Sequence, residues 1–374
     1  MGQAINIISF DVPFPANYGG VIDVFYKLVA LKNAGVKIHL HCFEYGRQHP
    51  TELEGLCEKI YYYKRNTSVS SHFSLLPYTV KSRQSKQLEE NLLSNNYPIL
   101  FEVLHTCYLL NDSRFANRKK IYRHSNIEHE YYSELAKAET SLIKKLFLKV
   151  EAFKLKRFEK ILNKANLILA VNKKDADYFA QKYSAVKTLY LPSFHQNNTL
   201  TIKEGKGDYC LYNGNLSVSE NYEAALWLIE NVFSKINFKV IIAGLNPPQF
   251  LETKISNYKN IELIKNPSQQ QMNELIANAQ IHTLYTKQPT GLKLKLLNVL
   301  YAGRFVVCNS NMVAGTDLKA DESIFICNTP NDFINSILTV FLLSFKSELV
   351  TKRDLQLDVF SNLKNTQLLL NEVF

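Results

Sequence analysis

The sequence predicts an α/β protein that contains two doubly wound parallel sheets, each forming a Rossmann-like domain. Three observations support this fold class. The chain opens with a strand, a glycine-bearing turn, a helix and a second strand over residues 5–43. The same strand–helix rhythm restarts after a polar, glycine-containing stretch at residues 196–208. At 374 residues, the chain also exceeds the length of one ordinary domain core.

The first domain is predicted over residues 1–195, and its opening turn ends in two glycines. Residues 5–10 have the length and apolar character of a buried strand, and residues 37–43 form the next strand after the helix. Gly19 and Gly20 lie where that helix begins. Because glycines carry no side chain, an anionic group could approach the backbone N–H groups there. A plain strand-to-helix turn is the alternative interpretation.

Two histidines follow strand-like runs of the first domain. Residues 99–104 end at His105, and residues 120–123 end at His124. Residues just past the carboxyl ends of parallel strands line the ligand crevice in open α/β sheets. We therefore expect both side chains to be placed for a functional role, His124 ahead of His105. The alternative is that a single histidine at a strand end is structural.

A basic, amphipathic stretch follows His124. The formal charge of the chain is +10, and residues 118–182 contain 16 Lys and Arg against 8 Asp and Glu, a net charge of +8. Residues 134–164 are predicted to be helical, with a basic remainder around an apolar stripe: Leu142, Leu146, Val150, Phe153, Phe158 and Ile161. Such a helix can lie on an anionic membrane, or it can pack its apolar stripe inward and expose the lysines.

Composition excludes several classes of protein. The six cysteines form no C-x-x-C pair, which argues against a disulfide framework or a zinc site. No apolar run reaches the roughly 18 residues that a membrane span needs, and the N-terminus does not read as a signal peptide, so a cytoplasmic protein is expected. The D-x-D run at Asp175 and Asp177 falls in the first turn of a predicted helix, where acids suit the helix dipole. We expect it to be structural and expect no metal site.

The second domain is predicted over residues 196–350, and its central segment is a helix from Gly291 to Gly303 followed by a short buried strand. Lys293 and Lys295 fall near the first turn of this helix. Cations there oppose the helix dipole, which favours negative charge at the N-terminus. The pattern indicates an anion held between free N–H groups and these ammonium groups, although two exposed lysines on a surface helix are the alternative.

This segment resembles the nucleotide-sugar segment of GT-B glycosyltransferases, in particular the large retaining family 4. That segment usually carries two glutamates, and Thr290 and Asn298 stand at their positions with the same spacing. The Gly19-Gly20 turn resembles the family loop that lies against the donor's diphosphate. The turn Gly214-Asn215-Leu216-Ser217 resembles a branch of the family in which Gly-Asn replaces the usual Gly-Arg.

The resemblance implies GT-B architecture, in which the last segment, residues 351–374, crosses back to the N-terminal domain. It implies transfer of a sugar from a nucleoside diphosphate sugar to a glycan or lipid-linked acceptor, with retention of configuration. No metal and no cofactor other than the donor are implied, and no nucleic acid is an expected partner. Peripheral contact with the inner face of an anionic membrane is a further expectation from the basic region.

The same resemblance assigns the site residues. The implied catalytic residues are His124, which would reach the donor sugar and phosphate, together with Thr290 and Lys295. The implied donor-binding residues are Gly19, Gly20, Asn215, Gly291, Leu292, Lys293 and Asn298. Asn215 and Asn221 stand where the family usually has an arginine and a lysine, so Lys293 and Lys295 are expected to replace that charge.

Two other functions remain open. The first is a GT-B nucleotide-sugar 2-epimerase, a class that usually has several catalytic acids in the cleft. The second is a catalytically silent sugar-nucleotide-binding protein, which the absence of both glutamates favours.

Overall fold

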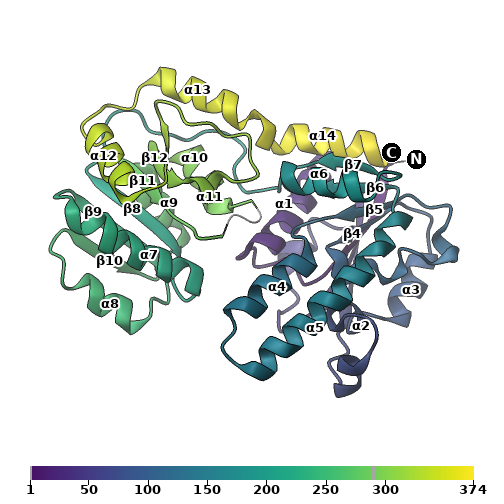
Figure 1. The fold of residues 1–374 in the computed structure, drawn as a ribbon. Coiled ribbons are helices and arrows are strands. Elements are labelled where there is room, and N and C mark those ends of the chain that lie inside the picture. Colours follow the sequence, from purple (N-terminus) through teal and green to yellow (C-terminus); the bar gives the residue numbers. More distant parts are fainter. Residues whose placement is uncertain (1, 289–291) are drawn as a thin grey trace. The chain divides into compact units, whose positions relative to one another are not determined.

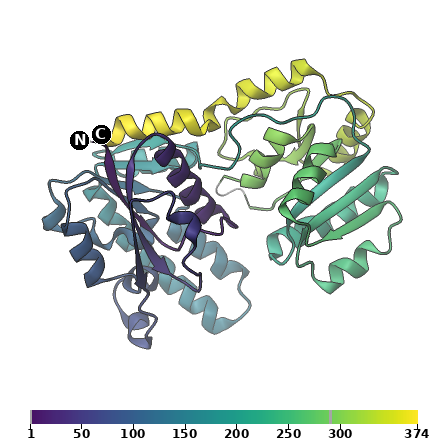
Figure 2. The same ribbon diagram turned by 180° about the vertical axis from the view of Figure 1, so that it is seen from behind.

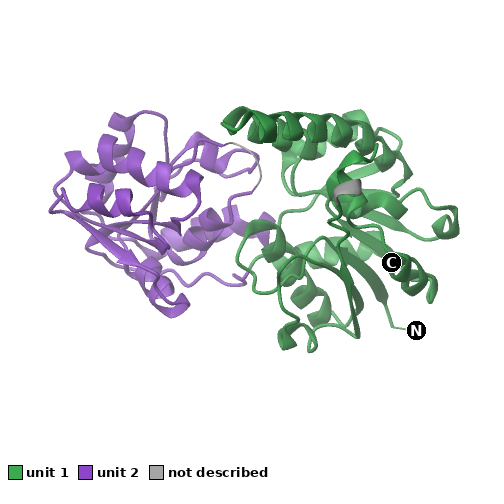
Figure 3. Cartoon of the chain, turned by 90° about the horizontal axis from the view of Figure 1, so that it is seen from below, with its two compact units in different colours: residues 1–195, 362–374 green, residues 196–361 purple. Residues whose placement is uncertain are grey.

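The computed structural model describes residues 2–288 and 292–374, which divide into two compact units (Figure 3). Unit 1 contains residues 1–195 and 362–374, and unit 2 contains residues 196–361. The division after His195 coincides with the end of the predicted first domain. The segment that returns to unit 1 starts at Asn362, eleven residues later than the predicted position 351.

Unit 1 is built on a parallel sheet of seven strands in the order β3-β2-β1-β4-β5-β6-β7. The chain moves outward from β1 to β3 and then returns to the other side of β1, which is the doubly wound arrangement that the sequence predicts. The strands are β1 (Ala4–Ser9), β2 (Lys37–Glu44), β3 (Lys59–Lys64), β4 (Ile99–Glu102), β5 (Lys120–Arg123), β6 (Leu167–Ala170) and β7 (Lys187–Tyr190).

Helices cover this sheet on both faces (Figures 1 and 2). Neighbouring residues of β1 show the two layers, since Ile7 packs into one hydrophobic cluster and Ile8 into another. The helices are α1 (Gly19–Asn33), α2 (Tyr78–Lys81), α3 (Lys86–Leu93), α4 (Glu128–Ala138), α5 (Leu142–Phe158), α6 (Lys173–Lys182) and α14 (Asn362–Val373). Helix α14 (yellow in Figure 1) packs on α1 through the cluster that contains Leu28 and Leu369.

Short 3₁₀ turns join these elements: η1 (Thr51–Leu53), η2 (Val69–Phe73), η3 (Leu104–Leu109), η4 (Ser113–Phe115) and η5 (Glu159–Lys164). The helical stretch predicted at residues 134–164 is divided in the structure. It forms α4, α5 and η5, with a break at Glu139, whose backbone is extended.

Unit 2 repeats the design with a parallel sheet of six strands in the order β10-β9-β8-β11-β12-β13. The strands are β8 (Tyr209–Asn215), β9 (Lys239–Leu245), β10 (Ile261–Lys265), β11 (Ile281–Leu284), β12 (Phe305–Asn309) and β13 (Ile324–Cys327). Two such sheets confirm the predicted fold class.

The helices of unit 2 are α7 (Ser219–Asn231), α8 (Gln249–Ile255), α9 (Gln269–Asn278), α10 (Leu294–Ala302), α11 (Ser310–Val313), α12 (Pro330–Val340) and α13 (Ser347–Leu357), with 3₁₀ turns η6 (Phe233–Lys235) and η7 (Asp358–Phe360). Helix α10 is the central helix that the sequence predicts. It begins at Leu294 with Lys293 as its N-cap, and the predicted start at Gly291 lies outside the described residues.

No helix among the described residues is long and apolar enough to cross a bilayer.

Candidate functional site

The order in which strands are added to the unit 2 sheet reverses between β8 and β11. Strand β9 lies on one side of β8 and β11 on the other, so the connections that leave β8 and β11 run to opposite sides. In open α/β sheets the carboxyl ends of strands at such a switch point form the ligand crevice. Here β8 ends in Gly214 and Asn215, and β11 is followed by Tyr285 and Thr286.

The Lys295 side chain, from the first turn of α10, lies at this switch point. Its Nζ donates to Oδ1 of Asn221 at 3.0 Å and lies 5.5 Å from the centre of the Tyr212 ring of β8. Burial lowers the pKa of Lys295 to about 8, although Glu220 nearby favours the charged form. A partly buried ammonium with one neutral hydrogen-bond acceptor retains donors for an anionic ligand.

Glu220 lies in the first turn of α7, beside these lysines, and the sequence analysis did not identify it. Its Oε1 accepts a hydrogen bond from Thr286 Oγ1 at 2.5 Å and lies 3.4 Å from Nζ of Lys293. Burial would raise the pKa of Glu220, but Lys293, the Thr286 hydroxyl and Lys295 together lower it below its usual value. The carboxylate is therefore ionised and holds Lys293 against α7.

The turn after β8 positions Asn221 to receive Lys295. Asn221 Nδ2 donates to the backbone oxygen of Asn215 at 2.9 Å, which leaves Oδ1 for the lysine. The Asn215 side chain accepts from the backbone N–H of Ser217 at 3.1 Å and from its hydroxyl at 2.7 Å, so it stabilises the turn. Lys295 thus brings a positive charge directly to Asn221, one of the two positions that lack their usual cation.

The other predicted residues of unit 2 lie along the same segment. Leu292 packs at the margin of the cluster that contains Leu296, and Oδ1 of Asn298 accepts a hydrogen bond from Asn197 at 2.9 Å. Thr290 and Gly291 lie outside the described residues. The structure therefore brings Lys293, Lys295 and the Asn215 turn together, and Asn298 follows one helical turn beyond Lys295.

In unit 1, the predicted glycines open α1. Gly19 is the first helical residue, and a Cβ there would meet no atom within 4 Å. A Cβ on Gly20 would lie 2.7 Å from the Phe10 ring, so this glycine also serves the packing of the loop. Tyr18, just before them, donates to Oδ2 of Asp11 at 2.9 Å. The open backbone at Gly19 is compatible with the predicted approach of an anion.

His124 follows β5, as predicted, but its side chain is completely buried. The ring packs edge-on against Phe179 at 4.9 Å between centroids, and Nε2 lies 3.4 Å from Oδ2 of Asp175. Burial lowers the pKa of His124 to about 3, so the imidazole is neutral at physiological pH. Neither ring nitrogen has a hydrogen-bond partner among the described residues. Both ring nitrogens of His124 therefore keep unused hydrogen-bonding capacity, as do those of the equally buried His282.

Neighbouring residues show what the other predicted groups do. Nε2 of His105 lies 3.2 Å from Oε2 of Glu128, a distance at which the two form an ion pair when the imidazole is protonated. Asp175 accepts a hydrogen bond from the Asn172 side chain at 2.7 Å while its own N–H donates to the Asn172 cap of α6. Asp175 thus lies in the first turn of α6, as predicted, whereas Asp177 lies beyond that turn. No group of three or more metal-ligating side chains occurs in the part of the chain that the structure describes.

A buried ion network lies beside His124 and was not identified from the sequence. The Arg123 guanidinium donates to both carboxylate oxygens of Asp23 at 3.0 Å and to the backbone oxygens of Leu191 and Pro192. Lys27 bridges Asp23 and Glu102, at 3.1 and 2.7 Å. The network joins α1, β4 and β5 to the backbone of residues 191–192. It thereby fixes the end of β5, which His124 follows.

Val103, which follows β4 at the switch point of unit 1, has a backbone φ of 58°. Branched side chains rarely adopt this left-handed conformation, and such strained residues cluster at functional sites. No sequence signal marks a valine for this role.

Comparison with known proteins agrees with this geometry. Residues 207–342 match the family model described as Glycosyl transferases group 1. A curated relative, an uncharacterized 44.6 kDa protein in the cps region of Klebsiella pneumoniae, is 28% identical over 357 residues, covering 89% of this chain and 90% of the relative.

Solved structures match over nearly the whole length. Sucrose-phosphate synthase from Thermosynechococcus elongatus aligns with a TM-score of 0.68 at 13% identity, covering 99% of this chain and 98% of that chain. HepE from Anabaena in complex with UDP and glucose aligns with a TM-score of 0.65 at 10% identity and the same coverage. TarM from S. aureus, in complex with UDP and alpha-GlcNAc-glycerol among other ligands, aligns with a TM-score of 0.67 at 12% identity, covering 99% of both chains. Residues 207–342 of unit 2 thus resemble the glycosyl transferases group 1 family, and the chain as a whole has the fold of GT-B glycosyltransferases.

Proposed function

We propose that this protein transfers a sugar from a nucleoside diphosphate sugar to a glycan or lipid-linked acceptor, with retention of configuration and without a metal ion. The observation that carries the proposal is the partly buried ammonium of Lys295, held by Asn221 at the switch point of the unit 2 sheet. This ammonium lies where the resemblance to family 4 expects the charge that meets the donor diphosphate.

The chemistry requires that negative charge on the departing diphosphate be neutralised as the bond to the sugar breaks. Lys295 supplies a full positive charge from a largely dehydrated position, where it acts more strongly than in water. The N-terminus of α10, with its free N–H groups, adds partial positive charge on the same side. These groups need no reorganisation during the reaction, because Asn221 and the Asn215 turn already hold the lysine in place.

Glu220 has a separate role in this proposal. Its carboxylate forms an ion pair with Lys293 and accepts a hydrogen bond from Thr286. These two residues flank the segment of the sequence that contains Thr290 and Gly291. Lys293 is therefore partly neutralised in the free protein, and Lys295 is the main cation for the diphosphate. Asn298 would hydrogen-bond the nucleoside ribose as a neutral partner.

The ligands of the fold neighbours support the choice of donor. HepE and TarM were both solved with UDP, which makes uridine diphosphate sugars the first donors to test. A lipid-linked acceptor would be presented at a membrane surface, which accords with the predicted peripheral membrane contact of the basic region. His124 is proposed to position the donor sugar as a neutral group.

The test is incubation of the full chain with UDP-glucose, UDP-galactose and UDP-N-acetylglucosamine, each with and without a bacterial lipid extract as acceptor. We expect release of UDP and a glycosylated product that requires the acceptor and persists in excess chelator. Isomerised free donor without any acceptor product would indicate the 2-epimerase. Donor binding by thermal shift, with no turnover in any combination, would indicate the silent binding protein.

A further inference from the structure

Helix α5 exposes the first part of the apolar stripe that the sequence predicts, whereas Phe158 and Ile161 at its end pack against a core cluster. Leu142 is 81% exposed, Leu146 is 64% exposed and Phe153 is 61% exposed. Positions 142, 146 and 153 share one helix face, because four residues are about one turn and seven are about two. Val150 completes this face and Ile143 flanks it, and both are exposed. This part of the stripe, from Leu142 to Phe153, therefore points to solvent.

The reason lies on the opposite face of the helix. Glu151, Ala152 and Leu155 are the buried residues of α5. The Glu151 carboxylate accepts a hydrogen bond from the backbone N–H of Tyr78 at 2.7 Å and pairs with Lys154 at 3.2 Å. A buried, fully partnered glutamate thus fixes the rotation of the helix and leaves the leucines outside.

A neighbouring segment adds to the exposed apolar area. Phe73 and Leu75, at the end of η2 and just after it, are 85% and 97% exposed. The segment is held to α5, since Lys154 Nζ donates to the backbone oxygen of His72 at 3.3 Å and the His72 ring lies 5.7 Å from that of Phe147. We call this combined area the α5 surface, formed by Phe73, Leu75, Leu142, Ile143, Leu146, Val150 and Phe153.

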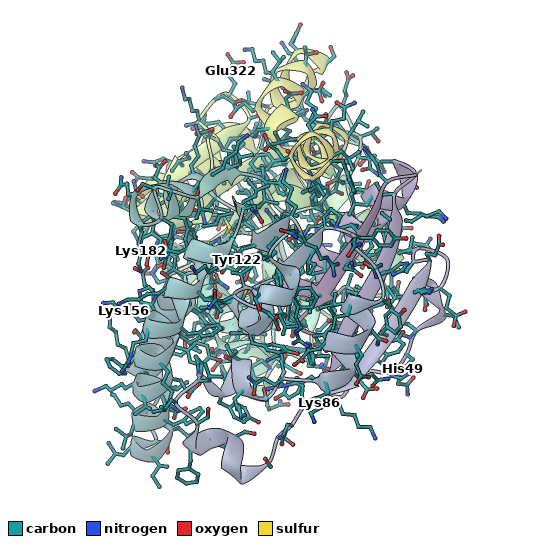
Figure 4. All side chains as sticks on the ribbon, turned by 90° about the vertical axis from the view of Figure 1, so that its right-hand side faces the viewer. His49, Lys86, Tyr122, Lys156, Lys182 and Glu322 are labelled. Atoms are coloured by element: carbon teal, nitrogen blue, oxygen red, sulfur yellow. The ribbon has the colours of Figure 1, made fainter. Side chains whose placement is uncertain are left out.

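Lysines flank the α5 surface on the side of α4. Between α4 and α5 lies a pocket of about 550 Å³, lined by Lys137, Lys145, Lys149 and Lys156, with His129, Ser133 and Phe153. Lys145, Lys149 and Lys156 form no ion pair with any residue that the structure describes. Figure 4 shows the side chain of Lys156 projecting from α5 away from the rest of the unit. Phe153 belongs to both the pocket and the apolar stripe, so the two features adjoin.

We propose that the α5 surface docks on a bilayer that contains anionic phospholipid. The leucines, isoleucine and phenylalanines enter the headgroup–acyl boundary, and the lysines of the pocket bind lipid phosphates. The charge of helix α5 favours an anionic bilayer over a second copy of the chain as the binding partner. Helix α5 carries six Lys and Arg against one Glu, and that glutamate is buried, so a second copy of the same face would be repelled. Nucleic acid would pair with the lysines but would leave the aliphatic side chains in water.

The experiment is flotation of the full chain with vesicles of phosphatidylcholine alone and of phosphatidylcholine with phosphatidylglycerol. We expect binding to the anionic vesicles that weakens as salt rises, because screening acts over about 10 Å at 0.1 M. The variant Leu142→Ser/Leu146→Ser/Phe153→Ser should bind on the order of 1,000-fold more weakly, since each of the three apolar side chains contributes roughly a factor of ten.

The matched control is Leu338→Ser/Leu342→Ser, which removes two exposed leucines of unit 2 and should bind like wild type. A single Phe153→Trp variant with brominated lipid gives a second measurement that needs no destabilising change. Quenching of the new fluorescence supports insertion at this position.

Three outcomes would overturn the proposal: no binding of wild type to anionic vesicles at low salt, unchanged binding by the triple variant, or a wild-type dimer that the triple variant abolishes. The last would assign the α5 surface to a second copy. Membrane docking does not depend on turnover, so failure of the glycosyltransferase assay leaves this test intact, and the converse also holds.

Discussion

The ammonium of Lys295 and the side-chain amide of Asn221 form a hydrogen bond of 3.0 Å between α10 and α7 at the carboxyl end of β8. Residues 74 positions apart in the chain thus meet at one place, which we propose as the binding position of the donor diphosphate. The bond holds the ammonium of Lys295 where the family resemblance expects a cation on the α7 side. Its consequences for ligand binding can be measured directly.

The first prediction concerns the affinity for the diphosphate. Lys295→Ala should weaken binding of UDP by roughly 1.5–3 kcal/mol, the range for one hydrogen bond to a charged group. Isothermal titration calorimetry measures this change. The matched control is Lys287→Ala, which removes an exposed lysine of the same unit that pairs with Glu223 at 3.0 Å, and which should leave the affinity unchanged. Equal affinities for wild type and Lys295→Ala would remove this lysine from the site.

The second prediction concerns pH. Burial lowers the pKa of Lys295 to about 8 in the free protein, so the side chain loses its proton as the pH rises through that value. A bound diphosphate favours the ammonium, and binding at pH 8.5 should therefore take up protons. The affinity should fall by up to about tenfold per pH unit above 8.

Calorimetry in two buffers of different ionisation enthalpy counts the protons taken up. Lys295→Arg keeps its charge throughout this range, so its affinity should be nearly independent of pH. A pH dependence that persists unchanged in Lys295→Arg would assign the titration to another group.

The third prediction concerns Gly303, which ends α10. A Cβ at this position would lie 2.2 Å from Nε2 of His282 and 2.9 Å from the backbone oxygen of Val299. The His282 ring is completely buried and cannot move aside freely. Gly303→Ala should lower the free energy of unfolding by about 1–3 kcal/mol or more, as other overpacking changes do.

Denaturant unfolding monitored by circular dichroism checks this value. The control is Gly55→Ala, because a Cβ there would meet no atom within 4 Å and the change should lie within about 0.5 kcal/mol of wild type. If Gly303→Ala were as stable as this control, that result would contradict the close approach of position 303 to the His282 ring of β11.

The sequence predicted the fold far better than it predicted which face of a helix packs against the core. Two strand–helix series separated by a polar stretch were enough for two doubly wound sheets, because apolar runs bounded by glycines identify buried strands. Helix α5 shows the limit. Its periodicity correctly indicates one apolar stripe, but it cannot show that Glu151 lies inside and Leu142 outside, since that depends on a hydrogen bond to Tyr78 far away in the sequence.

The candidate site was predicted in part for a similar reason. Lys295 stands out because a lysine opposes the dipole at the start of a helix. Glu220 carries no such signal, since an acid in the first turn of α7 is what any helix favours. Only its contacts with Thr286 and Lys293, more than sixty residues further along the chain, mark it as part of the site. Local sequence cannot report contacts of that range.

The last prediction concerns His124, and complete burial changes what is expected of it. A strand-end residue at an open crevice would leave the fold intact when truncated, but His124→Ala removes a ring packed against Phe179. We expect a loss of roughly 2 kcal/mol in the free energy of unfolding.

The acid stability should change in a defined direction as well. The pKa of His124 is lowered from 6.5 to about 3 in the folded protein, so the unfolded chain binds a proton between these values and the folded chain does not. The stability of the wild type must therefore fall as the pH drops from 6.5 towards 3, by about 1.4 kcal/mol per pH unit from this residue. His124→Ala should show a correspondingly shallower fall. Unfolding measured at pH 7 and pH 5 on both proteins tests the sign.

Turnover separates a positioning role of His124 from packing alone. If its unpaired ring nitrogens position the donor sugar, His124→Ala should lose about 10²-fold in kcat, the scale of one polar contact made in the transition state. Phe179→Leu is the matched control, because it loosens the same packing and leaves the imidazole in place. The assay is run well below both melting temperatures, so that each variant is folded. A neutral imidazole also predicts that kcat/KM shows no ionisation of His124 between pH 5 and 8. Normal turnover in His124→Ala, with the stability loss alone, would show that this histidine only packs.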